Sequence, residues 1–212
     1  MNSYFVTATG TDIGKTFCTA GLLRANPTLS AIKPLLSGYE EEQAESSDSG
    51  QLLAAMGREA TGANISAITP WRYKAPLSPD MAAAREGQSI DYAALLGFCR
   101  AELAKGPTLI EGAGGAAVPL TPTKLTVDWI ADLGLPVLLV TGSYLGGISH
   151  CITTAEFLLR RHISIHAVLL NESPQAPVPE AQTQATLERY LPCRIFPVRR
   201  DAGAEDFRTL AL

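Results

Sequence analysis

The sequence lacks the features that mark membrane, secreted and nucleic-acid-binding proteins. No run approaches the roughly 20 apolar residues that span a bilayer as a helix. The first residues carry neither a basic flank nor the apolar core of a secretory signal. Basic residues are not in excess, since 17 Lys and Arg stand against 21 Asp and Glu, and the formal net charge is −4. We therefore expect a cytoplasmic protein with no membrane and no nucleic-acid partner.

Metal-binding and disulfide patterns are also missing. The four cysteines are far apart in the chain and form no C-x-x-C pair. They are Cys18, Cys99, Cys151 and Cys193. The three histidines do not stand at zinc-ligand spacing from any of them. This usage is typical of reduced, mostly buried thiols in a cytosolic protein, and we expect no zinc site.

The sequence does contain a regular alternation of short apolar runs and longer stretches of helical pattern. Strands are expected at 4–7, 31–33, 108–111, 137–140, 166–170 and 194–196. Helices are expected at 15–25, 91–105, 124–133, 147–162 and 178–190. Nearly continuous apolar strands separated by helices indicate an α/β fold, a doubly wound and mostly parallel sheet with helices on both faces. At 212 residues, a single domain over 1–212 is expected.

Two segments between these elements are less regular. The segment 40–48 is acidic and polar, which predicts a solvated loop for its four glutamates, Glu40, Glu41, Glu42 and Glu45. The segment 70–79 carries two aromatic residues and three prolines. It is either a structured excursion over the site or ordinary surface packing, and the sequence leaves both interpretations open.

The first expected strand leads into a segment with the features of a phosphate-binding loop. It reads Thr7-Ala8-Thr9-Gly10-Thr11-Asp12-Ile13-Gly14-Lys15-Thr16 and precedes a helix. In such loops backbone N–H groups bind phosphate oxygens, the lysine reaches the terminal phosphates, and the hydroxyl ligates Mg²⁺. The spacing departs from G-x-x-x-x-G-K-[ST], because Thr9 stands at the first glycine and Gly10 follows it. The segment predicts a P-loop NTPase type of fold with an altered loop.

Two further charged residues follow expected strands. Glu111 ends an apolar strand and precedes the glycine-rich segment 112–115. Lys33 follows the second strand and precedes a proline. Ligands of open parallel sheets bind at the carboxyl ends of the strands. Glu111 is therefore a candidate magnesium contact and Lys33 a second cation at the same sheet edge.

Taken together, these segments resemble the dethiobiotin synthetase family. The matching stretches are YFVTATGTDIGKT at the start, IKPLLSG, SSD and APLSPDMAA in the middle, and IEGAGG, LGGISH and LLNESP later. They are spread from residue 4 to about 198, nearly the whole chain. The phosphate loop is common to many ATPases, whereas K-P-x-x-S-G, S-P-x-x-A-A and E-G-A-G-G in this order are far more specific.

The resemblance implies an ATP- and Mg²⁺-dependent ligase that closes the ureido ring of dethiobiotin in biotin biosynthesis. Its substrates would be 7,8-diaminononanoate, CO₂ (or bicarbonate) and ATP. One amine captures CO₂ as a carbamate, which attacks the γ-phosphate to give a carbamic–phosphoric anhydride. The second amine then closes the ring and expels phosphate. Such chemistry depends mainly on positioning and on neutralising the charge of two anions.

The resemblance also assigns roles residue by residue. Implied catalytic residues are Lys33, Lys15 and Thr11, the last near the carbamate. Implied magnesium ligands are Thr16, Asp48 and Glu111. Implied nucleotide-binding residues are Asp12, Ile13, Gly14, Lys15, Thr16 and Phe17 in the loop, Glu111, Gly112, Ala113 and Gly114, Asn171 (reading adenine) with Glu172, and Pro197, Val198 and Arg199 flanking the base. Implied substrate contacts are Ser37 and, from a homodimer partner, Gly146, Gly147, Ser149 and His150.

Several positions depart from the family pattern. Ala8 stands where the family has the first loop glycine, Gly10 where an aspartate is common, Asp80 where a histidine is common and Ser149 where an asparagine is common.

Two other classes of protein share the expected fold. A cobyric-acid-synthase-like enzyme would carry a glutaminase region, for which this chain has no room. A partition-type regulatory ATPase usually carries an extra lysine early in the loop, and residues 8–13 contain none.

Overall fold

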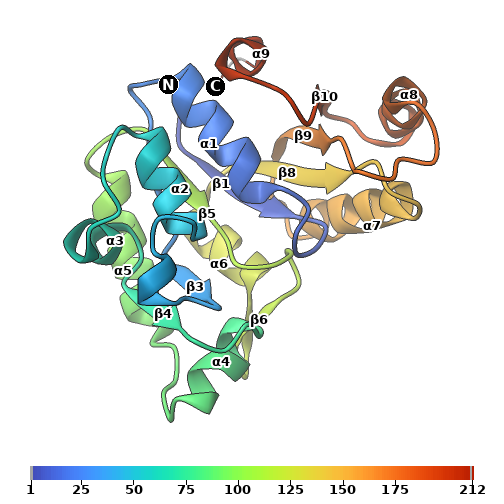
Figure 1. Cartoon of the computed structure of the whole chain (residues 1–212). Helices are drawn as coiled ribbons and strands as arrows, with labels where there is room; N and C mark the ends of the chain where they lie inside the picture. The colour runs from blue at the N-terminus through green and yellow to red at the C-terminus, as the bar shows by residue number, and fades with distance from the viewer. Residues whose placement is uncertain (1, 211) are drawn as a thin grey trace.

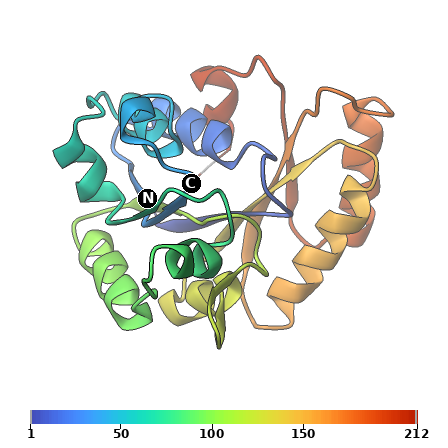
Figure 2. The ribbon, with the colours of Figure 1, turned by 60° about the horizontal axis from the view of Figure 1, so that its bottom comes forward.

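The computed structural model describes residues 2–210 and 212, and a six-stranded parallel sheet forms its centre. The strand order is β10-β9-β8-β1-β5-β2. In Figure 2 the sheet lies between two helical layers, with α1, α2 and α9 on one face and α5, α6 and α7 on the other. This is the doubly wound α/β arrangement that the sequence predicts.

The elements have the following bounds. The strands of the main sheet are β1 (Tyr4–Ala8), β2 (Ser30–Ile32), β5 (Thr108–Glu111), β8 (Val137–Gly142), β9 (Ile165–Asn171) and β10 (Arg194–Val198). The helices are α1 (Lys15–Ala25), α2 (Asp48–Ala55), α3 (Gly62–Ile68), α4 (Pro79–Arg85), α5 (Tyr92–Leu103), α6 (Thr126–Leu133), α7 (Gly147–Leu159), α8 (Glu180–Tyr190) and α9 (Ala204–Arg208). Two small sheets pair β3 (Leu35–Ser37) with β4 (Trp71–Tyr73) and β6 (Pro119–Thr121) with β7 (Lys124–Leu125).

The six predicted strands are all present, and the predicted helices agree within a few residues. Several boundaries differ by one to three residues. Residues 124–125 form β7 instead of the first turn of α6, α7 ends at Leu159 instead of 162, and the strand expected at 31–33 is observed at Ser30–Ile32, so that Lys33 directly follows it. The short helices α2, α3, α4 and α9 and both small sheets were not predicted, because such short elements show little periodicity.

The irregular segments have distinct structures. The four glutamates of 40–48 are exposed as expected, although residues 41–43 form a single 3-10 turn. The segment 70–79 forms β4, which pairs in parallel with β3, and then enters α4. Of the two interpretations, the structured excursion is the one observed (Figure 1).

The core lies on both faces of the main sheet, and β1 is buried at its centre. On one face the ring of Phe5 meets Trp129 of α6 edge-on, with centroids 4.8 Å apart. On the other face Phe207 of α9 packs against α1 so closely that a Cβ on Gly21 would overlap its ring. Three of the four cysteines are buried, and all four are free thiols. In the described part of the chain, no helix is long and apolar enough to cross a bilayer.

Candidate active site

The phosphate loop connects β1 to α1 at the carboxyl edge of the sheet, next to the point where the strand order reverses. Gly14 has φ 94°, a left-handed conformation that favours glycine, and a Cβ there would overlap Asn171 Nδ2. The amide of Asn171, at the end of β9, donates a 2.9 Å hydrogen bond to the carbonyl of Ile13. The loop is therefore held from the neighbouring half of the sheet before α1 begins at Lys15.

The phosphate loop, in which Gly10 stands one residue later than the usual first glycine, lies close against Gly115. Gly10 has no positive φ, so its backbone does not require glycine. A Cβ on Gly115 would lie 3.1 Å from the carbonyl oxygen of Ala8 and 3.4 Å from Gly10 N. The glycine-rich segment after β5 thus allows the chain to lie directly against the phosphate loop. Lys15 Nζ donates to the carbonyl of Gly10 at 3.3 Å, so its side chain curls back along the loop.

Lys33 joins the candidate magnesium ligands into one buried cluster. Its Nζ lies 2.7 Å from Glu111 Oε1 and 2.9 Å from Asp48 Oδ2. The hydroxyl of Thr16 donates to the same Glu111 oxygen at 2.7 Å. The Lys33 and Glu111 side chains are 3% and 0% exposed, whereas Asp48 is 40% exposed and faces the cavity described below. Four residues far apart in sequence therefore meet at one point.

The charges of this cluster stabilise one another. Burial alone would lower the pKa of Lys33, but the carboxylates of Glu111 and Asp48 outweigh it and hold that pKa above its ordinary value. Burial would raise the pKa of Asp48, but Lys33 outweighs it and holds that pKa below its ordinary value. Lys15 differs, because burial, assisted by the charge of Lys33, lowers its pKa from 10.5 to about 8. Lys33 is therefore protonated at neutral pH, whereas Lys15 changes its charge near pH 8.

One carboxylate oxygen of the cluster has no protein partner. Glu111 Oε2 is buried and makes no hydrogen bond within the described residues, while Oε1 accepts two. A buried carboxylate oxygen without a partner is costly unless a ligand or cation completes it. Carboxylate and hydroxyl oxygens are the ligands that Mg²⁺ prefers in proteins. The donor set of Thr16, Asp48 and Glu111 therefore fits a magnesium ion.

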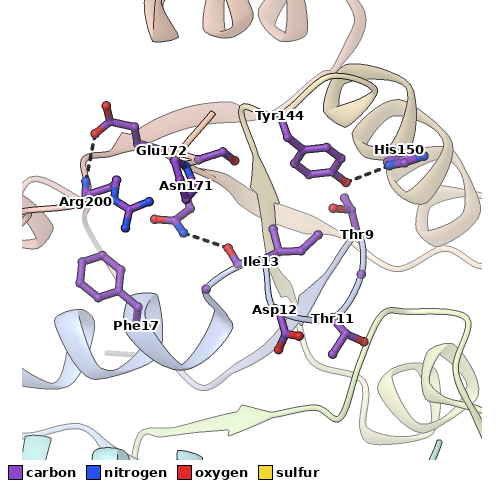
Figure 3. Close-up of a pocket in the computed structure, with 14 residues that line it drawn as sticks. Thr9, Thr11, Asp12, Ile13, Phe17, Tyr144, His150, Asn171, Glu172 and Arg200 are labelled. Atoms are coloured by element: carbon purple, nitrogen blue, oxygen red, sulfur yellow. Dashed lines mark hydrogen bonds between the residues drawn. The ribbon is translucent and has the colours of Figure 1, made fainter. Parts of the chain in front are cut away.

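Two cavities meet at the phosphate loop. The first, of about 610 Å³, lies between the loop and the ends of β8, β9 and β10. Figure 3 shows its lining: Thr9 to Thr11 and Tyr144 at one end, and Phe17, Asn171 and Arg200 at the other. The second, of about 930 Å³, contains Lys15, Thr16, Lys33 and Asp48. Thr11 lines both cavities, so it stands where they join.

The remaining lining of the second cavity comes from the two small excursions. Ser37 at the end of β3 lines it, and its hydroxyl is buried without a partner among the described residues. Across the cavity stand Leu77 and Ser78 of the 70–79 segment. Ser78 Oγ donates to Asp80 Oδ1 at 2.6 Å, so the aspartate that departs from the family pattern fixes this hydroxyl. Ala113 and Gly114 complete the wall.

Some predicted site residues lie elsewhere. Pro197 and Val198 end β10 and Arg199 follows it, but none of the three lines these two cavities. Gly146 caps α7 with φ 97°, and Ser149 is exposed and lies outside both cavities. His150 lines the first cavity, and its Nδ1 lies 2.8 Å from the hydroxyl of Tyr144.

Several lining residues were not predicted from the sequence. They include Thr9, Tyr144, Ser173, Pro174 and Arg200 in the first cavity and Leu77 and Ser78 in the second. Tyr144 and Ser173 follow β8 and β9, so the rule that ligands bind at strand ends could have found them. Arg200 follows β10 in the same way, whereas no sequence pattern indicates Leu77.

A parallel sheet with a phosphate loop after its central strand and carboxylates at the neighbouring strand ends defines a nucleotide-binding P-loop protein. A family model described as an AAA domain matches residues 2–198. Among solved structures, a ParA family ATPase from Chlorobium tepidum TLS is similar in fold, with a TM-score of 0.55 over 99% of this chain and 90% of that one at 13% identity.

Curated relatives narrow this class to one family. An ATP-dependent dethiobiotin synthetase BioD of Acidiphilium cryptum is 46% identical over 198 residues, which cover 90% of this chain and 89% of that protein. Its counterpart in Methylobacterium nodulans is 41% identical over 96% of this chain and 95% of that protein. The chain belongs to the ATP-dependent dethiobiotin synthetase family.

Proposed function

We propose that this protein forms dethiobiotin from 7,8-diaminononanoate, CO₂ and ATP, within one domain and in the cytoplasm. The observation that carries the proposal is the junction of two cavities at the phosphate loop, one beside Asn171 and the other beside Lys33. The first cavity accommodates the nucleotide and the second the diamine. The γ-phosphate then lies near Thr11, between the two, where a carbamate can reach it in line.

The cations of the site reduce the electrostatic repulsion between the two anionic reactants. A carbamate and a triphosphate are both anionic, and they repel each other as they approach. Lys15 begins α1 and binds the terminal phosphates together with the loop N–H groups. Lys33 stabilises the charge that develops as the carbamate oxygen meets the γ-phosphate, because it is fixed beforehand by Glu111 and Asp48.

Magnesium is proposed at the oxygens of Thr16, Asp48 and Glu111. When bound there, Mg²⁺ would neutralise phosphate charge. The protein supplies the remaining functions itself. Ser37, whose buried hydroxyl has no partner among the described residues, is placed to bind the diamine. β3 and the 70–79 segment form two walls of the cavity proposed for the diamine.

The far end of the substrate is proposed to lie in a homodimer. The Gly146–His150 segment opens α7, where the positive end of the helix dipole favours a carboxylate, and the N–H groups of Gly147 and His150 are already bonded to the carbonyls of Tyr144 and Gly146. Neither Gly146 nor Ser149 lines the two cavities of its own chain. We therefore assign this segment to the partner's site. The neighbouring Leu145 is 86% exposed, and burial in a dimer interface would remove that apolar surface from water.

A coupled ADP-release assay tests the proposal. We expect ATP turnover that requires both 7,8-diaminononanoate and bicarbonate, with dethiobiotin detected by mass spectrometry. A partition-type ATPase would hydrolyse ATP without the diamine. Turnover that is unchanged when either co-substrate is omitted would therefore reject the assignment.

Light scattering tests the dimer separately. We expect a dimer for the wild-type protein and dissociation in Leu145→Glu. A monomeric wild type, or a carboxylate held by a residue of the same chain in a substrate-bound structure, would remove the dimer from the proposal and leave the ATP site intact.

A further inference from the structure

Arg200 lines the first cavity directly after the segment 197–199, which lines neither cavity, and no role has been assigned to Arg200 so far. Its backbone N–H donates to Glu172 Oε2 at 3.1 Å, which fixes the start of its side chain. Within the described residues, its guanidinium makes no hydrogen bond or ion pair. The preceding Arg199 differs, because it pairs with Asp201 at 3.2 Å and lines neither cavity. Arg200 thus presents an unpaired cation to the cavity.

The loop that carries Arg200 is held at both ends. On one side it continues β10, whose register with β9 runs as far as Val198 opposite Asn171. On the other side it enters α9, which is fixed to α1 by Phe207. Phe207 contacts Phe17, with ring centroids 6.3 Å apart, and Phe17 itself lines the cavity. Arg200 and Phe17 are therefore held over one end of the same cavity.

The two ends of this cavity suit different parts of a nucleotide. Figure 3 shows Arg200, Phe17 and Asn171 together at one end, with Thr9, Thr11 and Tyr144 at the other. Residues 9–12 of the phosphate loop line the second end, so phosphates are expected there. The first end offers an aromatic face and a planar guanidinium. A flat heterocycle is the group that both of these surfaces bind by stacking.

We propose that Arg200 is a further nucleotide-binding residue, whose guanidinium stacks on the base of the nucleotide in the first cavity. The proposal rests on the proposed function in that it takes this cavity to be the ATP site. Stacking depends on the plane of the guanidinium and not on its charge alone, so a lysine cannot replace it. Stacking also tolerates different bases, because every base has a π face.

Binding measurements on the full chain test this role with two ligands, ATP and inorganic tripolyphosphate, each with Mg²⁺. The variants are Arg200→Ala, Arg200→Lys and, as a matched control, Arg208→Ala, an exposed arginine that pairs with Glu205 and lines neither cavity. We expect both Arg200 variants to weaken ATP binding about tenfold and to leave tripolyphosphate binding unchanged. Arg208→Ala should bind both ligands as the wild type does, and all variants should keep the wild-type Tm.

Four outcomes would overturn the proposal. Wild-type ATP affinity in Arg200→Ala would mean that the guanidinium does not contact the nucleotide. Equal weakening of ATP and tripolyphosphate, or full affinity in Arg200→Lys, would assign the effect to charge. A wild type that binds ATP no more tightly than tripolyphosphate would show that the base contributes nothing.

The outcome for Arg200 is separable from that for the proposed function. If the Arg200 variants bind as expected but ADP release does not depend on the diamine, the role of Arg200 is supported and the synthetase reaction is rejected. If the protein forms dethiobiotin but Arg200→Ala binds ATP as tightly as the wild type, the synthetase reaction is supported and the role of Arg200 is rejected.

Discussion

The two ends of the site are built in different ways. At the inner end, Thr16 and Lys33 come from different parts of the chain and both donate to Glu111 Oε1, and Lys33 and Glu111 are buried. At the outer end, Asn171 donates to the backbone carbonyl of Ile13, and Glu172 accepts the backbone N–H of the exposed Arg200. The inner end is therefore held by side chains that bond to one another, and the outer end by side chains that bond to the backbone.

This difference predicts different consequences of substitution. Charges that interact in a low-dielectric interior are strong and depend on one another, so a change at the inner end should affect turnover, metal use and stability together. Exposed contacts to backbone are weaker and more independent. A change at the outer end should therefore affect nucleotide affinity and leave the chemical step intact.

Lys33→Ala should have the largest effect. It removes the fixed cation near the transferred phosphate, which typically costs on the order of 10² to 10³ in rate. ATP affinity should fall much less, because the phosphate loop remains. Steady-state kinetics with separate ATP titrations check this, with the exposed Lys105→Ala as control. An unchanged kcat would return Lys33 to a purely structural role.

Asp48→Ala and Glu111→Ala should come next. Each removes a hard oxygen ligand, and we expect the apparent affinity for Mg²⁺ to fall on the order of 10- to 100-fold. Magnesium titrations of ADP release check this, and circular dichroism confirms that the variants are folded. The exposed Glu41→Ala is the control. Wild-type magnesium dependence in both variants would place the ion elsewhere.

The pH dependence of ATP binding should separate Lys15 from Lys33. Because burial lowers the pKa of Lys15 to about 8, the unliganded protein loses this positive charge as the pH rises through 8. ATP affinity should then fall by up to about tenfold per pH unit above that value, since phosphate favours the protonated lysine. Lys15→Arg stays charged and should show no such fall. An equal slope in both proteins would exclude Lys15 as the titrating group.

The stability of the unliganded protein should change in the opposite direction in the same range. Between pH 8 and the ordinary lysine pKa of 10.5, the unfolded chain binds more protons at Lys15 than the native protein does. The free energy of unfolding therefore rises with pH in this window through Lys15, and the cost of burying its charge is fully present below pH 8. Urea titrations of the wild type and Lys15→Arg measure this contribution.

The inner end could be predicted from the sequence, and the reason is geometric. Lys33 and Glu111 directly follow apolar strands, and parallel strands end at one edge of a sheet, so their meeting follows from the strand assignment. The small elements around the second cavity could not be predicted as easily. β3 and β4 have three residues each and are stabilised by pairing across a long stretch of sequence, Leu35 opposite Trp71. Such pairing leaves no local periodicity.

Two of the missed helices did carry a local signal. Ser47 accepts a hydrogen bond from Gly50 N at the start of α2, and Thr61 accepts one from Asn64 N at the start of α3. Hydroxyl residues at these positions are typical helix caps. Arg200 carries only the weak signal of its place after β10, because an exposed arginine after a strand is common at protein surfaces. Asn171 and Glu172 were predicted at the same end, so only part of the outer end required coordinates.

Glu172→Ala should have the smallest effect and is the most direct test of the contrast between the two ends. The carboxylate accepts the N–H of Arg200, and loss of one such hydrogen bond costs about 0.5–1.5 kcal/mol. We expect ATP affinity to fall about two- to tenfold, with kcat at saturating ATP and the magnesium dependence both unchanged. Glu172→Gln keeps an acceptor oxygen and should recover most of the affinity. A fall in kcat comparable to that of Lys33→Ala would show that the two ends act as one unit, because a backbone bond in a loop would then be coupled to the buried charges.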